Sequence, residues 1–149
     1  MPLHRIWYSP GAISEQDKES LAAHITKLYT SFGIPSFFVY VLYLPVEEKN
    51  FFVGGKKNRK FVRIIVQHIA RQFESNKRAD QFLEKYESIL APFIKERGLD
   101  WEVSVEQTDR NLWRENGMEA PLFNTIAWKE WVRLDKAVPY DEKDNVIVD

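Results

Sequence analysis

The chain has 149 residues, of which 44% are apolar and 14% aromatic, and this is enough for one folded domain with its own core. Its 21 basic and 22 acidic residues nearly cancel, which excludes a general electrostatic attraction to nucleic acid or to an anionic membrane. The absence of cysteine excludes disulfides and thiolate chemistry, and we expect a cytoplasmic location. Because the longest apolar run, 37–46, is far short of the roughly 20 residues of a membrane helix, we expect a soluble protein.

The first part of the chain is predicted to form a strand, a helix and a second strand. Branched and aromatic residues predict a strand over 2–8. Ser14 is a helix-capping residue, and the helical spacing of apolar side chains after it continues until Gly33 ends the helix. The segment 37–44 is apolar on both alternating faces, which predicts a strand at the centre of a covered, largely parallel sheet.

The second part repeats this plan. The sequence predicts a strand over 61–69, a helix capped by Ser75 that Pro92 kinks or ends, and a strand over 101–107 with clean apolar and polar alternation.

Two such units predict a duplicated β-α-β architecture with right-handed crossovers, in the α/β (α+β) class. The halves are expected at about 2–48 and 61–107, within one domain that covers 1–120. A mostly parallel sheet of four strands with two helices on one face follows from this plan.

Two further segments complete the predicted organisation. Residues 50–55 are typical of a hairpin because they end in the double glycine Gly54-Gly55. After Thr108 we expect a short helix, followed by an arm of the same domain over 121–149. The tryptophans of this arm are expected to pack on the sheet or on a neighbouring subunit.

Proline at the second position has a chemical consequence. A small second residue favours removal of the initiator Met1, which leaves Pro2 with a free secondary amine that can accept and return a proton. If Met1 stays, the same nitrogen is an amide whose lone pair is part of the planar peptide bond. The sequence therefore predicts a catalytic amine only in the processed chain. The alternative is that Met-Pro is simply how this chain begins.

Taken together, five features of the chain resemble the tautomerase superfamily, specifically proteins similar to cis-3-chloroacrylic acid dehalogenase. They are the proline at the start of a strand, the duplicated β-α-β plan, and the sequences FFVGG, HIAR and LWRENG in that order. The resemblance covers roughly 2–120 and depends on the order and spacing of these features. It implies a homotrimer of duplicated units, each with a pocket around the N-terminal amine.

The resemblance implies functional residues one position at a time. The catalytic proline falls on Pro2, the carboxylate-binding arginine on Arg71 and the catalytic glutamate on Glu115. A guanidinium at Arg71 can clamp a substrate carboxylate through two hydrogen bonds. On the residues alone, a solvated loop arginine is the favoured interpretation of Arg71, and Glu115 is explained as a surface helix residue paired with Arg114 or Arg110.

Three other positions depart from the family pattern. The second arginine falls on Glu74, the active-site histidine on Tyr29 and the water-positioning tyrosine on Ser104. We expect Tyr29 and Ser104 to contact substrate, although Tyr29 also lies on an apolar helix stripe, where a core role is equally expected. Arg78 or Lys77 can replace the missing second arginine. Ser104 is too short to hold an activated water as a phenol does.

The function predicted from these residues is keto–enol isomerisation of a 2-oxo acid, with residual hydratase or dehalogenase-like activity. This reaction needs a group that moves a proton and a cation that holds the carboxylate. The alternative is a catalytically silent module that kept the scaffold as a binding surface. No cofactor and no metal are expected, because the histidines lack ligand spacing. The basic run 56–60 is predicted to be a solvated loop, so nucleic acid is not an expected partner.

Overall fold

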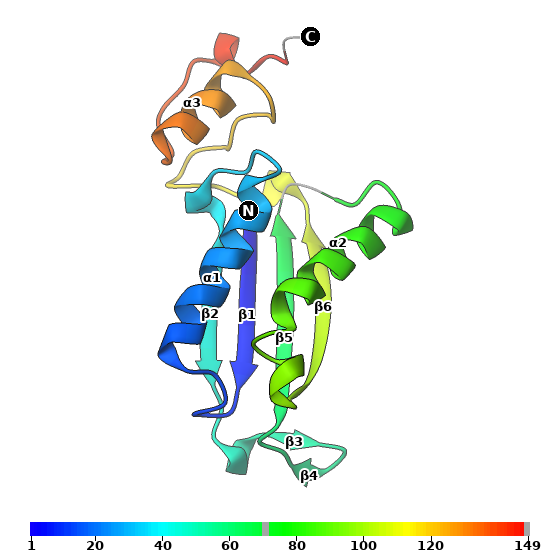
Figure 1. Cartoon of the computed structure of the whole chain (residues 1–149). Helices are drawn as coiled ribbons and strands as arrows, with labels where there is room; N and C mark the ends of the chain where they lie inside the picture. Colours follow the sequence, from blue (N-terminus) through cyan, green and yellow to red (C-terminus); the bar gives the residue numbers. More distant parts are fainter. Residues whose placement is uncertain (70–71, 148–149) are drawn as a thin grey trace.

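The computed structural model describes residues 1–69 and 72–147. One four-stranded sheet carries two long helices on the same face (Figure 1). The strands follow the order β2-β1-β5-β6 across the sheet. They are β1 (Pro2–Tyr8), β2 (Tyr40–Pro45), β5 (Phe61–Ile69) and β6 (Asp100–Thr108), and the helices above them are α1 (Glu15–Thr30) and α2 (Asn76–Leu90).

The pairing of the strands confirms the predicted duplication. β1 pairs with β2 in parallel, β5 pairs with β6 in parallel, and the two halves meet where β1 and β5 run antiparallel. In this central pair Pro2 lies opposite His68 and His4 lies opposite Val66. The start of β1 and the end of β5 therefore lie together at one end of the central strand pair.

Both long helices begin where capping residues predict. Ser14 accepts a hydrogen bond from the backbone N–H of Asp17 at 3.1 Å, and Ser75 accepts one from that of Arg78 at 3.4 Å. Each bond satisfies a backbone donor that has no partner inside the helix. α2 ends at Leu90, two residues before Pro92, as the ring of that proline requires.

The main core fills the space between the sheet and these helices. Alternate residues of β1, and Val62, Ile64 and Val66 of β5, point toward the helices and are buried, while their neighbours in sequence point to the other face. The helices contribute one apolar stripe each. The buried aliphatic members of this core are Ile6, Ile13, Leu21, Ile25, Val62, Ile64, Val66, Leu90 and Ile94.

The predicted position of the second strand was wrong. β2 lies at the edge of the sheet and begins at Tyr40, after a single 3₁₀ turn at Ser36–Phe38. Its residues are apolar on both sides because Val41 and Tyr43 pack on the helix-covered core, whereas Leu42 lies on the face that no helix of the described chain covers. An apolar run on both faces was thus not a sign of a central strand.

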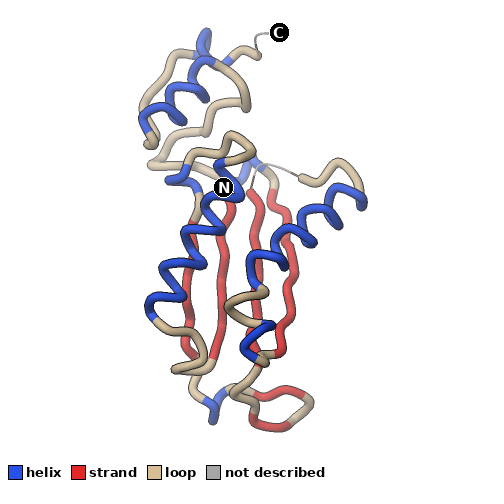
Figure 2. Tube along the Cα trace, in the orientation of Figure 1, coloured by secondary structure: helices blue, strands red, loops and turns tan. Residues whose placement is uncertain are grey.

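Beyond the sheet, the structure has a hairpin at one end and an arm at the other (Figure 2). The hairpin strands β3 (Phe52–Val53) and β4 (Lys56–Lys57) are joined by two glycines with positive φ, and the basic run is exposed there. The arm carries α3 (Ile126–Leu134). The helix predicted soon after Thr108 is only a 3₁₀ turn at Arg110–Leu112.

The arm has its own aromatic core. Phe38 lies between the rings of Trp113, Trp128 and Trp131, with ring centroids 5.0 to 6.0 Å apart. The side chain of Met1 also packs against this cluster. The arm is thus attached next to the start of β1. No helix in 1–69 or 72–147 has both the length and the apolar character needed to cross a membrane.

The prediction that the arm belongs to the same domain as the sheet can be tested by a substitution at Trp131. Because the Trp131 ring is fully buried, Trp131→Ala is expected to lower the free energy of unfolding by about 3–5 kcal/mol and to shift the whole transition, as one domain requires. Val132→Ala is the matched control, since Val132 is 38% exposed. Denaturant unfolding followed by far-UV circular dichroism measures both. A separate early transition for the arm would contradict one domain over residues 1–149.

Candidate active site

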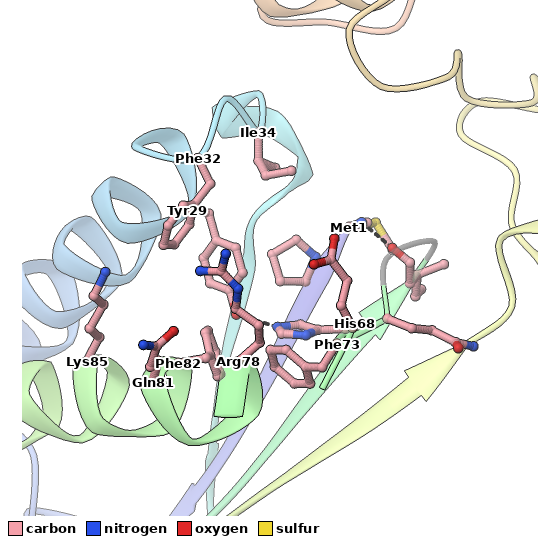
Figure 3. Close-up of a pocket in the computed structure, with 14 residues that line it drawn as sticks. Met1, Tyr29, Phe32, Ile34, His68, Phe73, Arg78, Gln81, Phe82 and Lys85 are labelled. Carbon is pink, nitrogen blue, oxygen red and sulfur yellow. Dashed lines mark hydrogen bonds between the residues drawn. The ribbon is translucent and has the colours of Figure 1, made fainter. Parts of the chain in front are cut away.

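A cavity of about 310 Å³ opens at the end of the sheet where β1 begins and β5 ends. Its side walls come from the end of α1 and the first half of α2 (Figure 3). Most of the lining is apolar and aromatic, with Phe32, Phe73 and Phe82 among its members. A few polar side chains converge on this apolar space, which is the usual composition of a small-molecule site.

The N-terminal amine lies at this cavity. Met1 and Pro2 both line it, Pro2 is buried, and the Met1 amine donates a hydrogen bond to the carbonyl of Ile69 at 2.9 Å. Burial lowers the pKa of this amine from 8.0 to about 5, and the nearby Glu115 carboxylate opposes that shift. Loss of hydration therefore outweighs the attraction of the carboxylate at this position.

Glu115 is held by a tight turn beside the amine. It exchanges backbone hydrogen bonds with Met118 at 2.8 and 2.9 Å, and the turn between them contains Asn116 and Gly117 with positive φ. Its carboxylate accepts a long hydrogen bond of 3.4 Å from the hydroxyl of Tyr40 on β2. The pKa of Tyr40 is raised by burial and by this carboxylate.

Two tyrosine–histidine pairs lie beneath the helices. Tyr29 Oη is 2.8 Å from His68 Nε2, and Tyr86 Oη is 2.8 Å from His4 Nδ1. Tyr29 and His68 line the cavity, whereas His4 and Tyr86 do not. Burial raises the pKa of both tyrosines and lowers that of His4 from 6.5 to about 3, so both phenols keep their protons and His4 is neutral near pH 7.

α2 supplies the described cations of the cavity. Arg78 and Lys85 are seven residues apart, which is about two helical turns, so they lie on one face of the helix. Figure 3 shows both side chains extending from α2 toward Tyr29 and Phe32. Glu74 also lines the cavity, and its negative charge opposes the binding of an anion there.

The structure brings together some of the predicted site residues. Pro2 and Tyr29 line the cavity, and Glu115 lies close to the N-terminal amine. Ser104 does not join them, because it lies on the open face of the sheet, where Arg63 Nη2 donates to its hydroxyl at 3.3 Å. Arg71 lies outside the described residues.

Sequence reasoning missed His68 as a site residue. A signal was present, since strand alternation places His68 on the same face as the buried Val62, Ile64 and Val66, where a polar side chain is unexpected. What the sequence lacked was the register that places His68 opposite Pro2. Within 1–69 and 72–147, no group of three or more acidic or histidine side chains is arranged to hold a metal ion.

Comparisons with known proteins identify the family. The family model described as "Putative oxalocrotonate tautomerase enzyme" matches residues 1–136, so the chain belongs to this tautomerase family. No curated protein matches the chain in sequence.

Solved structures support the same assignment. Native RhCC from Rhodococcus jostii RHA1 is 37% identical over 93% of this chain and 99% of that chain, with a TM-score of 0.89. A probable enzyme from the thermophilic fungus Aspergillus fumigatus is 33% identical over 94% of this chain and 98% of that chain, with a TM-score of 0.90. N1, a member of the cis-3-chloroacrylic acid dehalogenase family, shares the fold at 20% identity, with coverage of 79% and 82% and a TM-score of 0.66.

The buried His4 makes stability depend on pH. Because its pKa is about 3 in the folded chain and 6.5 otherwise, the unfolded chain binds more protons between these values, and stability is lost as the pH falls through that window. His4→Gln is expected to reduce the slope of unfolding free energy against pH by about 1.4 kcal/mol per unit. His24→Gln, at an exposed imidazole, is the control. Urea unfolding across this pH range measures the slopes. Equal slopes in both variants would show that His4 does not cause the pH dependence of stability.

Proposed function

We propose that this protein interconverts the keto and enol forms of a 2-oxo acid, with the amine of Pro2 as the proton carrier after Met1 is removed. The observation that carries this proposal is the position of the N-terminus, which is buried at an apolar cavity in an environment that holds an amine largely neutral. Removal of Met1 moves the amine by one residue, about 3.8 Å, to the buried Pro2. Because Pro2 is buried at the same cavity, we expect loss of hydration to lower the pKa of the prolyl amine as well.

The proposed proton transfer needs only one group. The neutral Pro2 amine takes the proton from the enol oxygen and becomes an ammonium ion. The ammonium then returns this proton to C3, where the electron pair of the C2–C3 double bond forms the new C–H bond, and the C2–O bond becomes a carbonyl. Nothing else is gained or lost. Glu115 favours the charged form of the amine and so stabilises the intermediate ion pair.

Arg78 is the candidate for the carboxylate of the substrate among the described residues. It lines the cavity, and a guanidinium can bind a carboxylate through two parallel hydrogen bonds. Arg71, the residue implied by the family pattern, is retained in the proposal as a second clamp. The aromatic walls formed by Phe32, Phe73 and Phe82 favour a 2-oxo acid with an aromatic side chain, such as phenylpyruvate.

A silent binding module is the second candidate. Glu74 favours it, because an acid in the cavity weakens anion binding where the family pattern has an arginine. Hydratase or dehalogenase-like activity has less support, since Ser104 faces away from this cavity. A chain that keeps Met1 in its native host has no prolyl amine and belongs to the silent class, and the mass of its N-terminal peptide decides this.

The assembly and location of the protein are further parts of the proposal. On the open face of the sheet, Tyr40 is 38% exposed and Leu42 is 45% exposed. Exposed apolar side chains of this size favour coverage by another copy of the chain, and we propose the homotrimer of the family pattern. The balanced charge and the absence of cysteine favour a cytoplasmic location.

Pro2 provides the direct test of the mechanism. In the processed chain, Pro2→Ala is expected to lower kcat/KM for phenylpyruvate enol by about 100-fold or more, because the pyrrolidine ring no longer fixes the lone pair toward the substrate. A chain that retains Met1 is expected to be inactive. Pro10→Ala, at an exposed proline, is the control. Enol absorbance measures turnover, and undiminished activity of Pro2→Ala would reject the mechanism.

Arg78 tests the anion site. Arg78→Gln is expected to raise KM about 10-fold with a smaller change in kcat, because it removes a charge that holds the carboxylate in both ground and transition states. Lys77→Gln is matched to it, since Lys77 is the preceding residue of α2 and does not line the cavity. Equal KM values for the two variants would show that Arg78 does not bind the substrate.

A further inference from the structure

The two tyrosine–histidine pairs are chemically alike but lie in different surroundings. His4 and Tyr86 are both fully buried, and their rings stack at 5.4 Å with an interplanar angle of 18°. Tyr29 and His68 meet at the cavity, with their rings edge to face at 5.7 Å. His68 also faces Pro2 across the β1–β5 pair. One pair therefore lies inside the core, and the other lies beside the proposed proton carrier.

We propose that His68 is a positioning residue, which holds the Tyr29 hydroxyl so that its proton points to the C2 oxygen of the bound 2-oxo acid. This inference rests on the proposed function and deepens it by naming the group that stabilises the oxygen while Pro2 moves the proton. It assigns to His68 a role that acts through Tyr29 and not by contact with the substrate.

The hydrogen-bond inventory of the two side chains supports this arrangement. The 2.8 Å bond between Tyr29 Oη and His68 Nε2 allows either atom to donate, and the proposal assigns the proton to Nε2. A phenol has one donor and two acceptor positions, so Tyr29 Oη then accepts from Nε2–H and still donates its own proton. Burial raises the pKa of Tyr29, so the hydroxyl remains protonated and acts as a donor. If Tyr29 Oη did not accept this bond from Nε2–H, rotation about the C–O bond would let the hydroxyl proton turn away from the cavity.

The surrounding rings restrict the histidine itself. Phe82 lies edge to face with the His68 ring at 5.0 Å, and Phe73 lies at 5.3 Å. On its other side, Tyr29 contacts His4 edge to face at 5.4 Å. These contacts fix both rings before a substrate enters, which is the condition under which a donor stabilises developing charge most effectively. Figure 3 shows the Tyr29–His68 bond at the centre of the cavity wall.

The chemistry at the substrate oxygen follows from this geometry. As Pro2 takes the enol proton, negative charge grows on the C2 oxygen, and a hydrogen bond from the Tyr29 hydroxyl stabilises it. When the proton reaches C3, the oxygen becomes a neutral carbonyl and the bond weakens. The interaction is therefore strongest in the transition state, so its loss is expected to lower kcat more than it changes KM.

A double-mutant cycle tests the inference, and it uses the protein without Met1 in its native assembly. Tyr29→Phe and His68→Leu are each expected to lower kcat for phenylpyruvate enol by about 100-fold with KM nearly unchanged, as for other donors to a developing oxyanion. The double variant is expected to lose no more than Tyr29→Phe alone, because His68 acts only through the hydroxyl. His68→Gln keeps an N–H donor and is expected to recover part of the lost kcat.

The buried pair of His4 and Tyr86 supplies the matched control. Tyr86→Phe deletes the same hydroxyl from a bond of the same length, but away from the cavity, so it is expected to lower thermal stability and leave kcat within about twofold. Thermal unfolding of every variant separates loss of folding from loss of positioning.

Each outcome bears on a different claim. The inference would be overturned by a wild-type kcat in Tyr29→Phe or His68→Leu, by effects that multiply in the double variant, or by an equal loss of kcat in Tyr86→Phe. In each of these cases, turnover that still depends on Pro2 would leave the proposed function intact. A wild-type chain that fails to convert any enol would overturn the proposed function, and this inference with it.

Discussion

The antiparallel pairing of β1 with β5 is the constraint on which the site depends. It joins the two β-α-β halves and fixes the register in which Pro2 lies opposite His68. Because side chains alternate along a strand, a slip of one residue would move His68 and Val66 from the helix-covered face to the open face. The buried residues of both strands and the packing of α1 and α2 over them hold this register. The same contacts that stabilise the fold therefore position the N-terminus at the cavity.

The electrostatics of the cavity are set by burial more than by charge. The N-terminal amine loses most of its hydration among apolar side chains, and this lowers its pKa despite the nearby Glu115. Glu115 is partly exposed, so solvent screens its attraction for the amine. The apolar walls thus keep the N-terminal amine largely neutral near pH 7, and the carboxylate limits how far its pKa falls.

Features encoded by neighbouring residues could be predicted from the sequence. The caps at Ser14 and Ser75 and the Gly54-Gly55 turn depend on local backbone geometry, and the structure confirms each of them. The position of β2 and the role of His68 depend on which strands become neighbours, and that is set by contacts between distant segments. Ser104 shows the same limit, since only the register of β5 with β6 assigns it to the open face. Pro2 and Tyr29 could thus be named from the sequence and its family resemblance as residues near a cavity, whereas His68 could not.

The two tyrosine–histidine pairs place polar side chains where apolar ones would stabilise the fold at lower cost. A buried imidazole or phenol costs free energy unless its polar atoms are bonded, and apolar side chains would fill the same space without that cost. His4 illustrates the cost, because its Nε2 has no hydrogen-bond partner within the described part of the chain. The sheet would be more simply stabilised by leucine and phenylalanine at these positions. Under the proposal, Tyr29 and His68 present a fixed hydroxyl proton where the substrate oxygen is expected to bind, whereas His4 and Tyr86 bond to one another within the core and do not line the cavity.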